Sequence, residues 1–386
     1  MRHLVALAVV VLSTLSVSEA PAPVYATDPN NLVVHEWGTF TSVAGRDGEA
    51  LPWLPLSGAD DLPCFVDRIA FGIKPNLSGT IRMETPVLYF YAPSEMTAQV
   101  SVRFKQGALT EWYPRAAVMP TQLDSTTTLG EMESTATWSN VLIRPGFTPV
   151  YPQEGGQSHY YAARATDASP VQMNGQDEKF LFYRGVGGFD PPMSAALTSD
   201  GRVRVEARRG GDVLHFDSAD GRIRYRFAHS GSSRMTLDPP VEGDLQALHS
   251  QLERLLVAHG LYEREARAMV ETWKDSWFEP GARLIYIVPR SFIDATLPLD
   301  VHPRSSSIAR VFVGRIELLS DAKLASVKGA LLNGDAAALN AHGRFLWPAV
   351  QRVLAASSGE EKARLERSLA LVYRMPTHNL RRCQAS

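Results

Sequence analysis

Three glutamates of this sequence lie beside aromatic residues, a setting that suggests acid–base chemistry on a sugar. Glu36 precedes Trp37, Glu84 precedes an apolar and aromatic run, and Glu111 precedes Trp112. Carbohydrate-active sites combine two carboxylates, one acting as acid and the other as nucleophile or base, with flat aromatic surfaces. One hypothesis is therefore a hydrolase in which Glu36 is the acid and Glu84 or Glu111 is its partner. In this hypothesis Trp37 and Trp112 contact the ligand, whereas the alternative places these aromatic residues in the core, their commoner role in β proteins.

The position of Glu36 on a strand leaves two interpretations open. Successive strand residues point to opposite faces, so Glu36 and His35 cannot easily act on one atom. Glu36 shares its face with apolar residues such as Val34 and Phe40. Desolvation there would raise the pKa of its carboxyl and suit it to act as a general acid. The favoured interpretation is instead a buried glutamate paired with an arginine.

The histidines do not form a short-spaced metal motif. His35-Glu36 lacks the second histidine, four residues on, that a zinc-protease helix requires. A metal site assembled from the distant His35, His159 and His302 stays open, although isolated histidines are the simpler interpretation. The sequence contains neither a Gly-x-Ser-x-Gly nucleophile elbow nor a Walker-type phosphate loop, and we predict no cofactor.

Arginines give the clearest local charge pattern. Between Asp200 and Arg234 there are eight arginines and five acids, and Arg204, Arg224 and Arg226 are predicted to bind a ligand. Rows of arginine can bind polymers that carry carboxylate or phosphate groups. The alternative is a solvated sheet face whose arginines pair with neighbouring acids.

The first 26 residues have the order of a secretory signal peptide. A short basic start is followed by an apolar stretch and by two small-residue cleavage sites that end at Ala20 and Ala26. No later segment approaches the roughly 20 apolar residues of a spanning helix, so we expect no membrane span after cleavage. The formal net charge of −2 argues against a nucleic-acid partner. We expect a periplasmic or secreted protein.

Two cysteines, Cys64 and Cys383, are present. In an oxidising compartment an even count permits one disulfide bond. Two separate thiols are the alternative, and mass measurement with and without reductant would distinguish the two states.

The periodicity of the sequence predicts an α+β fold. After the signal peptide at 1–26, we expect a β-rich, sandwich-like or open-barrel domain at 27–237 and an inserted helical hairpin at 238–280. Returning strands follow at 281–318 and a helical C-terminal lobe at 319–386. Whether the returning strands join the first sheet is left open.

Particular elements can be placed within these regions. Short strands separated by glycine-containing turns predict a three-strand meander over Val203–Ala207, Val213–Asp217 and Arg222–Phe227. Asp244 is expected to cap the first helix of the hairpin. Pro348 must either kink a helix or begin a new one.

The chain resembles a family of exported bacterial proteins that carry His-Glu-Trp-Gly-Thr-Phe near the mature start. That segment stands at 35–40 here, and the other matching stretches are 83–90 and 310–315. The resemblance extends along most of the chain. It implies export and a single coherent family, and it carries no activity over.

Two functions follow from these patterns. The first is a non-catalytic binding or envelope-associated protein whose partner is an envelope or extracellular polymer. The second is a hydrolase of a glycan or another envelope polymer that uses paired carboxylates. The binding function is preferred because no motif demands catalysis.

Overall fold

The computed structural model describes residues 31–57, 61–71, 77–123, 128–154, 158–229 and 231–372. The predicted signal peptide and Cys383 lie outside these residues. About 40% of the chain is strand and 28% is helix, with a large β body and helices in the C-terminal part. The predicted α+β class is therefore confirmed.

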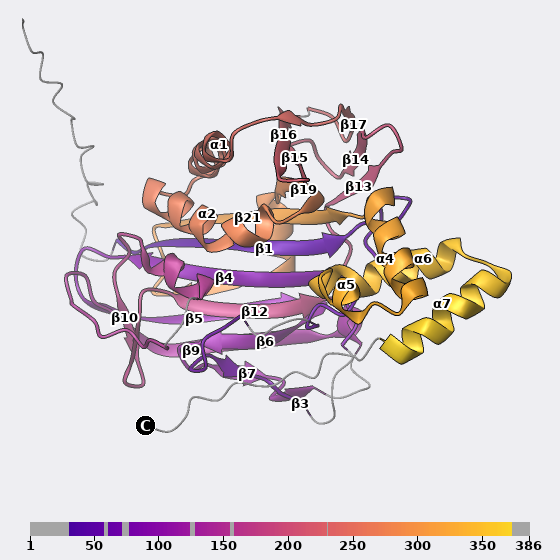
Figure 1. The fold of residues 1–386 in the computed structure, drawn as a ribbon. Helices are drawn as coiled ribbons and strands as arrows, with labels where there is room; N and C mark the ends of the chain where they lie inside the picture. Colours follow the sequence, from indigo (N-terminus) through magenta and orange to yellow (C-terminus); the bar gives the residue numbers. More distant parts are fainter. Residues whose placement is uncertain are drawn as a thin grey trace, which may run out of the picture.

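One ten-stranded sheet organises the molecule (Figure 1). Its strands, in their order across the sheet, are β18 (Val241–Glu242), β16 (Arg222–His229), β15 (Asp212–Ala219), β19 (Gly281–Ile287), β21 (Ser307–Leu318), β1 (Val33–Val43), β4 (Ile81–Tyr91), β12 (Leu181–Gly187), β6 (Gly107–Tyr113) and β2 (Asp67–Arg68). The late strands β19 and β21 thus join the first strands at the centre of one sheet. The strands before residue 237 and those after residue 281 therefore contribute to one sheet, on either side of the helical hairpin in the sequence.

The central strands are buried on both faces, which explains their composition. Every residue of β4 is buried, and β1 is buried from Val34 onward. Such strands have nearly continuous apolar runs rather than strict alternation. β1 pairs parallel with β21 and antiparallel with β4, so early and late segments of the described chain meet here.

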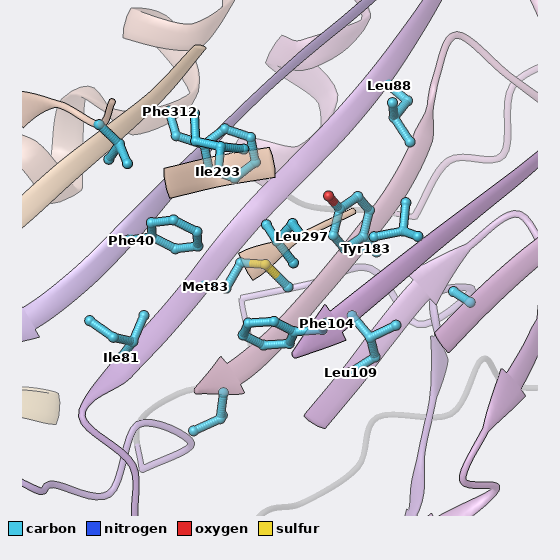
Figure 2. Packing of buried hydrophobic residues seen from close by; sticks show 14 of the residues in the cluster. Phe40, Ile81, Met83, Leu88, Phe104, Leu109, Tyr183, Ile293, Leu297 and Phe312 are labelled. Carbon is cyan, nitrogen blue, oxygen red and sulfur yellow. The ribbon is translucent and has the colours of Figure 1, made fainter. Parts of the chain in front are cut away.

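A second sheet packs against one side of the first, which we call the sandwich face. It contains β11 (Gln176–Glu178), β10 (Val171–Met173), β9 (Glu133–Ile143), β5 (Met96–Lys105) and β20 (Leu299–His302), with β7 (Ala117–Met119) paired to β9. Apolar residues of both sheets form one core cluster, and Figure 2 shows Phe40, Met83, Phe104 and Leu109 gathered within it. This packing of two sheets agrees with the sandwich-like prediction.

A three-stranded sheet covers another part of the sandwich face and contradicts the predicted meander. It consists of β13 (Met193–Leu197), β14 (Val203–Ala207) and β17 (Arg234–Leu237). β14 therefore pairs with β13 and β17, whereas β15 and β16 belong to the large sheet. Val203 and Val205 of β14 are buried in the core cluster, so burial against the large sheet outweighs pairing with the next strand in sequence.

The predicted helical hairpin lies on the opposite side of the large sheet, which we call the helix face. It is formed by α1 (Leu245–Ala258) and α2 (Glu263–Trp277). The Asp244 side chain accepts a hydrogen bond of 2.7 Å from the Ala247 N–H, as expected of a helix cap. Trp273 and Trp277 lie buried between α2 and the sheet. The short helix η2 (His159–Arg164) packs against α2 on the same face.

The C-terminal helices form a lobe at one end of the sheet, beyond the end of β1 (Figure 1). They are α4 (Asp321–Asn333), α5 (Ala336–Asn340), η3 (Gly343–Phe345), α6 (Leu346–Ala356) and α7 (Gly359–Val372). Pro348 stands in the first turn of α6, where its missing N–H removes no helical hydrogen bond, so it begins a new helix.

Several smaller elements were not predicted. Among them are α3 (Arg290–Thr296), η1 (Leu129–Glu131) and the pair β3 (Ala70–Phe71) and β8 (Gln122–Leu123). α3 places Ile293 in the core of the sandwich face. Among the described residues, no helix combines the length and apolar character that crossing a membrane requires.

Candidate functional site

Glu36 is fully buried on the sandwich face and is held by an arginine and a tyrosine. Its carboxylate accepts 2.5 Å hydrogen bonds from Arg310 Nε and from the Tyr183 hydroxyl. Burial raises the pKa of Tyr183, and the adjacent Glu36 raises it further. Figure 2 shows Tyr183 among the apolar side chains of the core. The carboxylate is therefore committed to internal partners, as the favoured interpretation of the sequence proposed.

Glu84 and Glu111 lie on the helix face, the side of the sheet opposite Glu36. Glu84 of β4 lies opposite Thr39 of β1, which stands three residues after Glu36. Its carboxylate accepts a 3.0 Å hydrogen bond from Arg344. Although burial alone would raise the pKa of Glu84, the nearby arginines hold it below its ordinary value. Glu111 accepts from the Thr110 hydroxyl at 2.5 Å. The structure does not bring Glu36 together with either partner, so the predicted acid pair is wrong.

The two predicted ligand-contacting tryptophans are core residues. Trp37 is fully buried in the cluster beneath the helical hairpin, and Trp112 is 9% exposed in the cluster of the sandwich face. They lie in different cores, so they cannot form one surface for a sugar.

The three candidate metal-binding histidines are dispersed. His35 binds the Glu265 carboxylate through Nδ1 at 2.7 Å and packs against the Tyr262 ring. His159 stands on η2, 3.7 Å from a carboxylate oxygen of Asp275, and His302 is exposed on β20. Within the described part of the chain, no three potential metal ligands lie close together. The predicted grouping of these histidines is not formed.

The predicted arginine row is divided between two sheets. Arg204 lies on β14, whereas Arg224 and Arg226 lie on β16. Arg224 binds Asp217 at 2.9 Å, and Arg226 Nε donates to the Pro239 carbonyl at 3.0 Å. Arg204 does not lie on the same sheet as Arg224 and Arg226, because the meander that would have aligned the three residues is absent.

Cys64 is disulfide-bonded. Cys383, the other cysteine of the sequence, lies outside the described residues, so the pairing of these two residues stays a prediction.

A groove of about 720 Å³ at the end of β4 is a candidate ligand site. This volume falls within the range of ligand pockets. It is lined by Tyr91, Ala92, Pro93, Pro145, Gly146, Phe147, Thr148, Pro149, Tyr151, Thr166, Asp167, Ala168, Ser169, Pro170 and Lys179. The lining thus comes from the chain after β4, the loop after β9, the chain between η2 and β10, and the chain before β12.

Two aromatic rings of the groove are each supported by an ion-paired arginine. The Arg144 guanidinium lies 3.9 Å from the centre of the Phe147 ring, and Arg144 pairs with Glu95 at 3.0 Å. The Arg164 guanidinium lies 4.9 Å from the centre of the Tyr151 ring. These cation–π contacts hold the two rings in place, although neither ring belongs to a core cluster.

Arg164 is itself held in place by a buried carboxylate. Its Nε and Nη2 atoms donate to the two oxygens of Glu178 at 2.8 and 2.7 Å, a bidentate geometry. Tyr160 also donates to Glu178, at 3.1 Å. Tyr151 is therefore positioned by a network that reaches into the fold.

Three polar side chains face the same groove. Lys179 Nζ donates to the Ala168 carbonyl at 2.8 Å, and burial lowers the pKa of this amine. Asp167 pairs with Arg264 of α2 at 2.6 Å. Thr166 is 7% exposed, and its hydroxyl has no hydrogen-bond partner among the described residues. The groove therefore offers both donors and acceptors beside its rings.

The groove continues toward the helical hairpin. Thr166 also borders a second hollow of about 480 Å³, whose wall includes Arg264, Arg267 and Glu271 of α2. Adjacent hollows of this size suit an extended ligand better than a compact one.

The sequence patterns did not identify this groove, although a signal was present. The segment 145–152 contains three prolines with Phe147, Val150 and Tyr151 between them. Such a segment forms neither a helix nor a central strand. Aromatic residues in such a surface segment do not pack into the core. Their presence in this segment could therefore have indicated a binding site.

Comparisons with known proteins give no family for this chain. No family model matches it, and no curated protein matches it. A match among solved structures, titled "Yeast delta-COP-I mu-homology domain", covers 76% of this chain and 98% of that chain, with 8% identity and a TM-score of 0.29. A likeness this weak carries no argument about fold or function.

Proposed function

We propose that this protein is an exported, non-catalytic binding protein that holds a glycan strand of the cell envelope in the groove at the end of β4. The observation that carries the proposal is the pair of rings, Phe147 and Tyr151, each backed by an arginine and flanked by polar groups. Aromatic rings supply a large rigid apolar surface, which suits the C–H face of a sugar ring.

The polar groups favour a glycan over a proline-rich peptide. Sugar hydroxyls both donate and accept hydrogen bonds, so they can satisfy the Asp167 carboxylate, the Lys179 amine and the Thr166 hydroxyl together. The carbonyls of a proline-rich peptide only accept, and proline has no N–H to donate. Such a peptide would add fewer donors than a sugar to the Asp167 carboxylate, whose existing partner is Arg264.

The positions of the three glutamates favour binding over hydrolysis. Glycoside hydrolysis needs two carboxyl groups that flank one bond. Glu36 lies on the opposite face of the sheet from Glu84 and Glu111, and arginines hold Glu36 and Glu84. The hydrolase alternative therefore has no carboxylate pair that includes Glu36, its proposed acid.

The proposed location outside the cytoplasm rests on two supports. The first is the basic, apolar and small-residue order of residues 1–26. The second is the disulfide bond of Cys64, since disulfides persist in oxidising compartments.

The binding proposal is tested by replacing one ring of the groove. We expect Tyr151→Ala to weaken binding of chitohexaose or cellohexaose about tenfold, because the sugar loses one stacking surface. Isothermal titration calorimetry on the full mature chain measures the effect.

Val150→Ala is the matched control, since Val150 is the preceding residue, is 86% exposed and does not line the groove. Equal affinity of both variants for the oligosaccharide would contradict the proposal. So would failure of both oligosaccharides and of peptidoglycan glycan strands to bind, or release of new reducing ends from any of them.

A further inference from the structure

Charged side chains converge on the helix face at the end of the sheet away from the groove. Arg82 and Glu84 lie near the start of β4, whereas the groove begins at Tyr91, its last residue. The charged set, which we call the arginine cluster, contains Arg82, Arg184, Arg283, Arg315, Arg344 and Lys323 with the carboxylates of Asp61, Glu84, Glu279 and Glu317. It lies where the sheet, α2 and the C-terminal lobe meet.

The outer contacts of the cluster connect these three parts of the fold. Ser276 of α2 accepts from Arg315 at 2.7 Å and from Arg344 of η3 at 2.8 Å. Glu317 of β21 accepts from Lys323 of α4 at 2.9 Å and from Arg283 at 3.2 Å. Several cationic groups of the cluster are thus held by hydrogen bonds to Ser276 and Glu317.

Three arginines of the cluster each have one nitrogen atom that makes no hydrogen bond. The Nε atoms of Arg82, Arg184 and Arg315 are buried and have no hydrogen-bond partner among the described residues. The same holds for the hydroxyls of Thr39 and Thr41 on β1. Unsatisfied buried donors are rare in folded proteins, and each calls for a ligand or an ordered water.

The strand register places these groups around Thr41. Thr41 is paired with Arg315 of β21 on one side and with Arg82 of β4 on the other, so all three share the helix face. Directly paired residues on one face have Cβ atoms about 5 Å apart. Thr41 thus lies between two arginines whose Nε atoms have no hydrogen-bond partner, and all three residues are at least nine-tenths buried.

The charge balance of the cluster is positive. Its six cations exceed its four carboxylates by two. Glu111 also stands near Arg184, so counting it leaves an excess of one positive charge. Burial is the largest cause that lowers the pKa of Arg82, and the positive charge of nearby Arg184 lowers it further. Both effects are expected of a buried cation among other cations. A buried positive excess favours an anion over a neutral water.

Solvent reaches the rim of the cluster. The side chains of Asp61 and Glu279 are each 36% exposed, and Arg344 is 17% exposed. Arg344 also lies against the Phe345 ring, which Arg315 and Lys323 contact as well, at 5.0 to 5.4 Å from its centre. The cluster is therefore in contact with solvent at Asp61, Glu279 and Arg344, although its centre is buried.

We propose that the arginine cluster binds one small tetrahedral oxyanion, of the phosphate or sulfate type, between Thr41, Arg82 and Arg315. A tetrahedral oxyanion presents acceptors in several directions and can receive both Nε–H groups and the threonine hydroxyl at once. The site is independent of the groove, so its test does not depend on glycan binding.

The test uses Thr41→Val in the full mature chain. Valine keeps the β-branched shape and removes only a hydroxyl that has no partner among the described residues, so the variant should fold as well as wild type. We expect inorganic phosphate to bind wild type and to raise its Tm above that in chloride at equal ionic strength, with affinity weakened about tenfold in Thr41→Val. Calorimetry with phosphate, sulfate and acetate compares the anions.

Thr296→Val is the matched control, because Thr296 is buried on α3 at the sandwich face, away from the cluster. It should bind phosphate as wild type does, and so should Tyr151→Ala. Equal phosphate affinity of Thr41→Val and Thr296→Val would overturn the proposal. The proposal also fails if phosphate and sulfate act no differently from chloride, or if acetate alone binds.

Discussion

His35 and Glu36 are adjacent in the sequence, yet they belong to separate networks on opposite faces of the sheet. His35 contacts Glu265 beneath the hairpin, whereas Glu36 contacts Arg310 and Tyr183 in the sandwich core. Strand alternation alone predicts this separation. The identity of the partners could not be predicted, because Arg310 and Glu265 are brought to β1 by long-range pairing and packing.

Removing the charge of Glu36 should affect stability rather than binding. Glu36→Gln leaves the buried Arg310 guanidinium without its closest carboxylate, and breaking a buried ion pair in this way costs about 3 kcal/mol of the free energy of unfolding. Urea denaturation measures the loss. Oligosaccharide affinity should stay unchanged in the folded variant.

Glu206→Gln is the control for this prediction, since Glu206 pairs with Arg234 on the surface and such pairs contribute less than about 1 kcal/mol. A Glu36→Gln variant as stable as wild type would show that the ion pair with Arg310 does not stabilise the fold. Release of reducing ends by wild type and not by Glu36→Gln would restore the catalytic hypothesis.

At the scale of elements, local patterns predicted helices and strands better than their pairing. The cap at Asp244 depends on a few neighbouring residues and was predicted, and the new helix at Pro348 was one of the two alternatives that the sequence left open. The separation of β14 from β15 depends on where Val203 and Val205 find a core, which is not local information. The groove escaped prediction for the same reason, because four separate segments meet to form it.

The attachment of the helical hairpin to the sheet depends on one carboxylate. Glu265 at the start of α2 accepts from the Tyr91 hydroxyl at 2.7 Å, from the Tyr262 N–H at 2.8 Å and contacts His35. Glutamine removes the negative charge and puts an amide NH₂ where Oε1 stands, and this group cannot accept from the Tyr91 hydroxyl.

We therefore expect Glu265→Gln to loosen the first turns of α2 while the sheet stays intact. Amide hydrogen exchange should rise at least about tenfold at 262–269, which corresponds to the loss of one buried hydrogen bond to a charged group. Glu263→Gln, on the exposed side of the same turn, is the control. Unchanged exchange in Glu265→Gln, or an equal rise in Glu263→Gln, would exclude this role.

At the scale of the whole molecule, the groove and the arginine cluster lie near opposite ends of the large sheet. The groove lies at the end of β4 and the arginine cluster near its start, on a strand of 11 residues. An 11-residue strand spans about 35 Å. The two sites therefore have different neighbours, the groove beside the hairpin and the cluster beneath the C-terminal lobe, and they can be tested separately.

The groove also explains the overall arrangement of the β body. Its walls come from segments that adjoin strands of both sheets, after β4, after β9, before β10 and before β12, so the site exists only when the sandwich is assembled. A binding protein of this kind needs a rigid frame rather than a mobile lid. The arginine-backed rings supply that rigidity at the groove itself.

The most direct measurement is a crystal structure of the mature protein with a bound envelope oligosaccharide. We expect sugar rings against Phe147 and Tyr151, with hydroxyls within hydrogen-bond distance of Thr166, Asp167 and Lys179. A sugar bound elsewhere on the molecule, or a groove that stays free of sugar at saturating concentration, would contradict it.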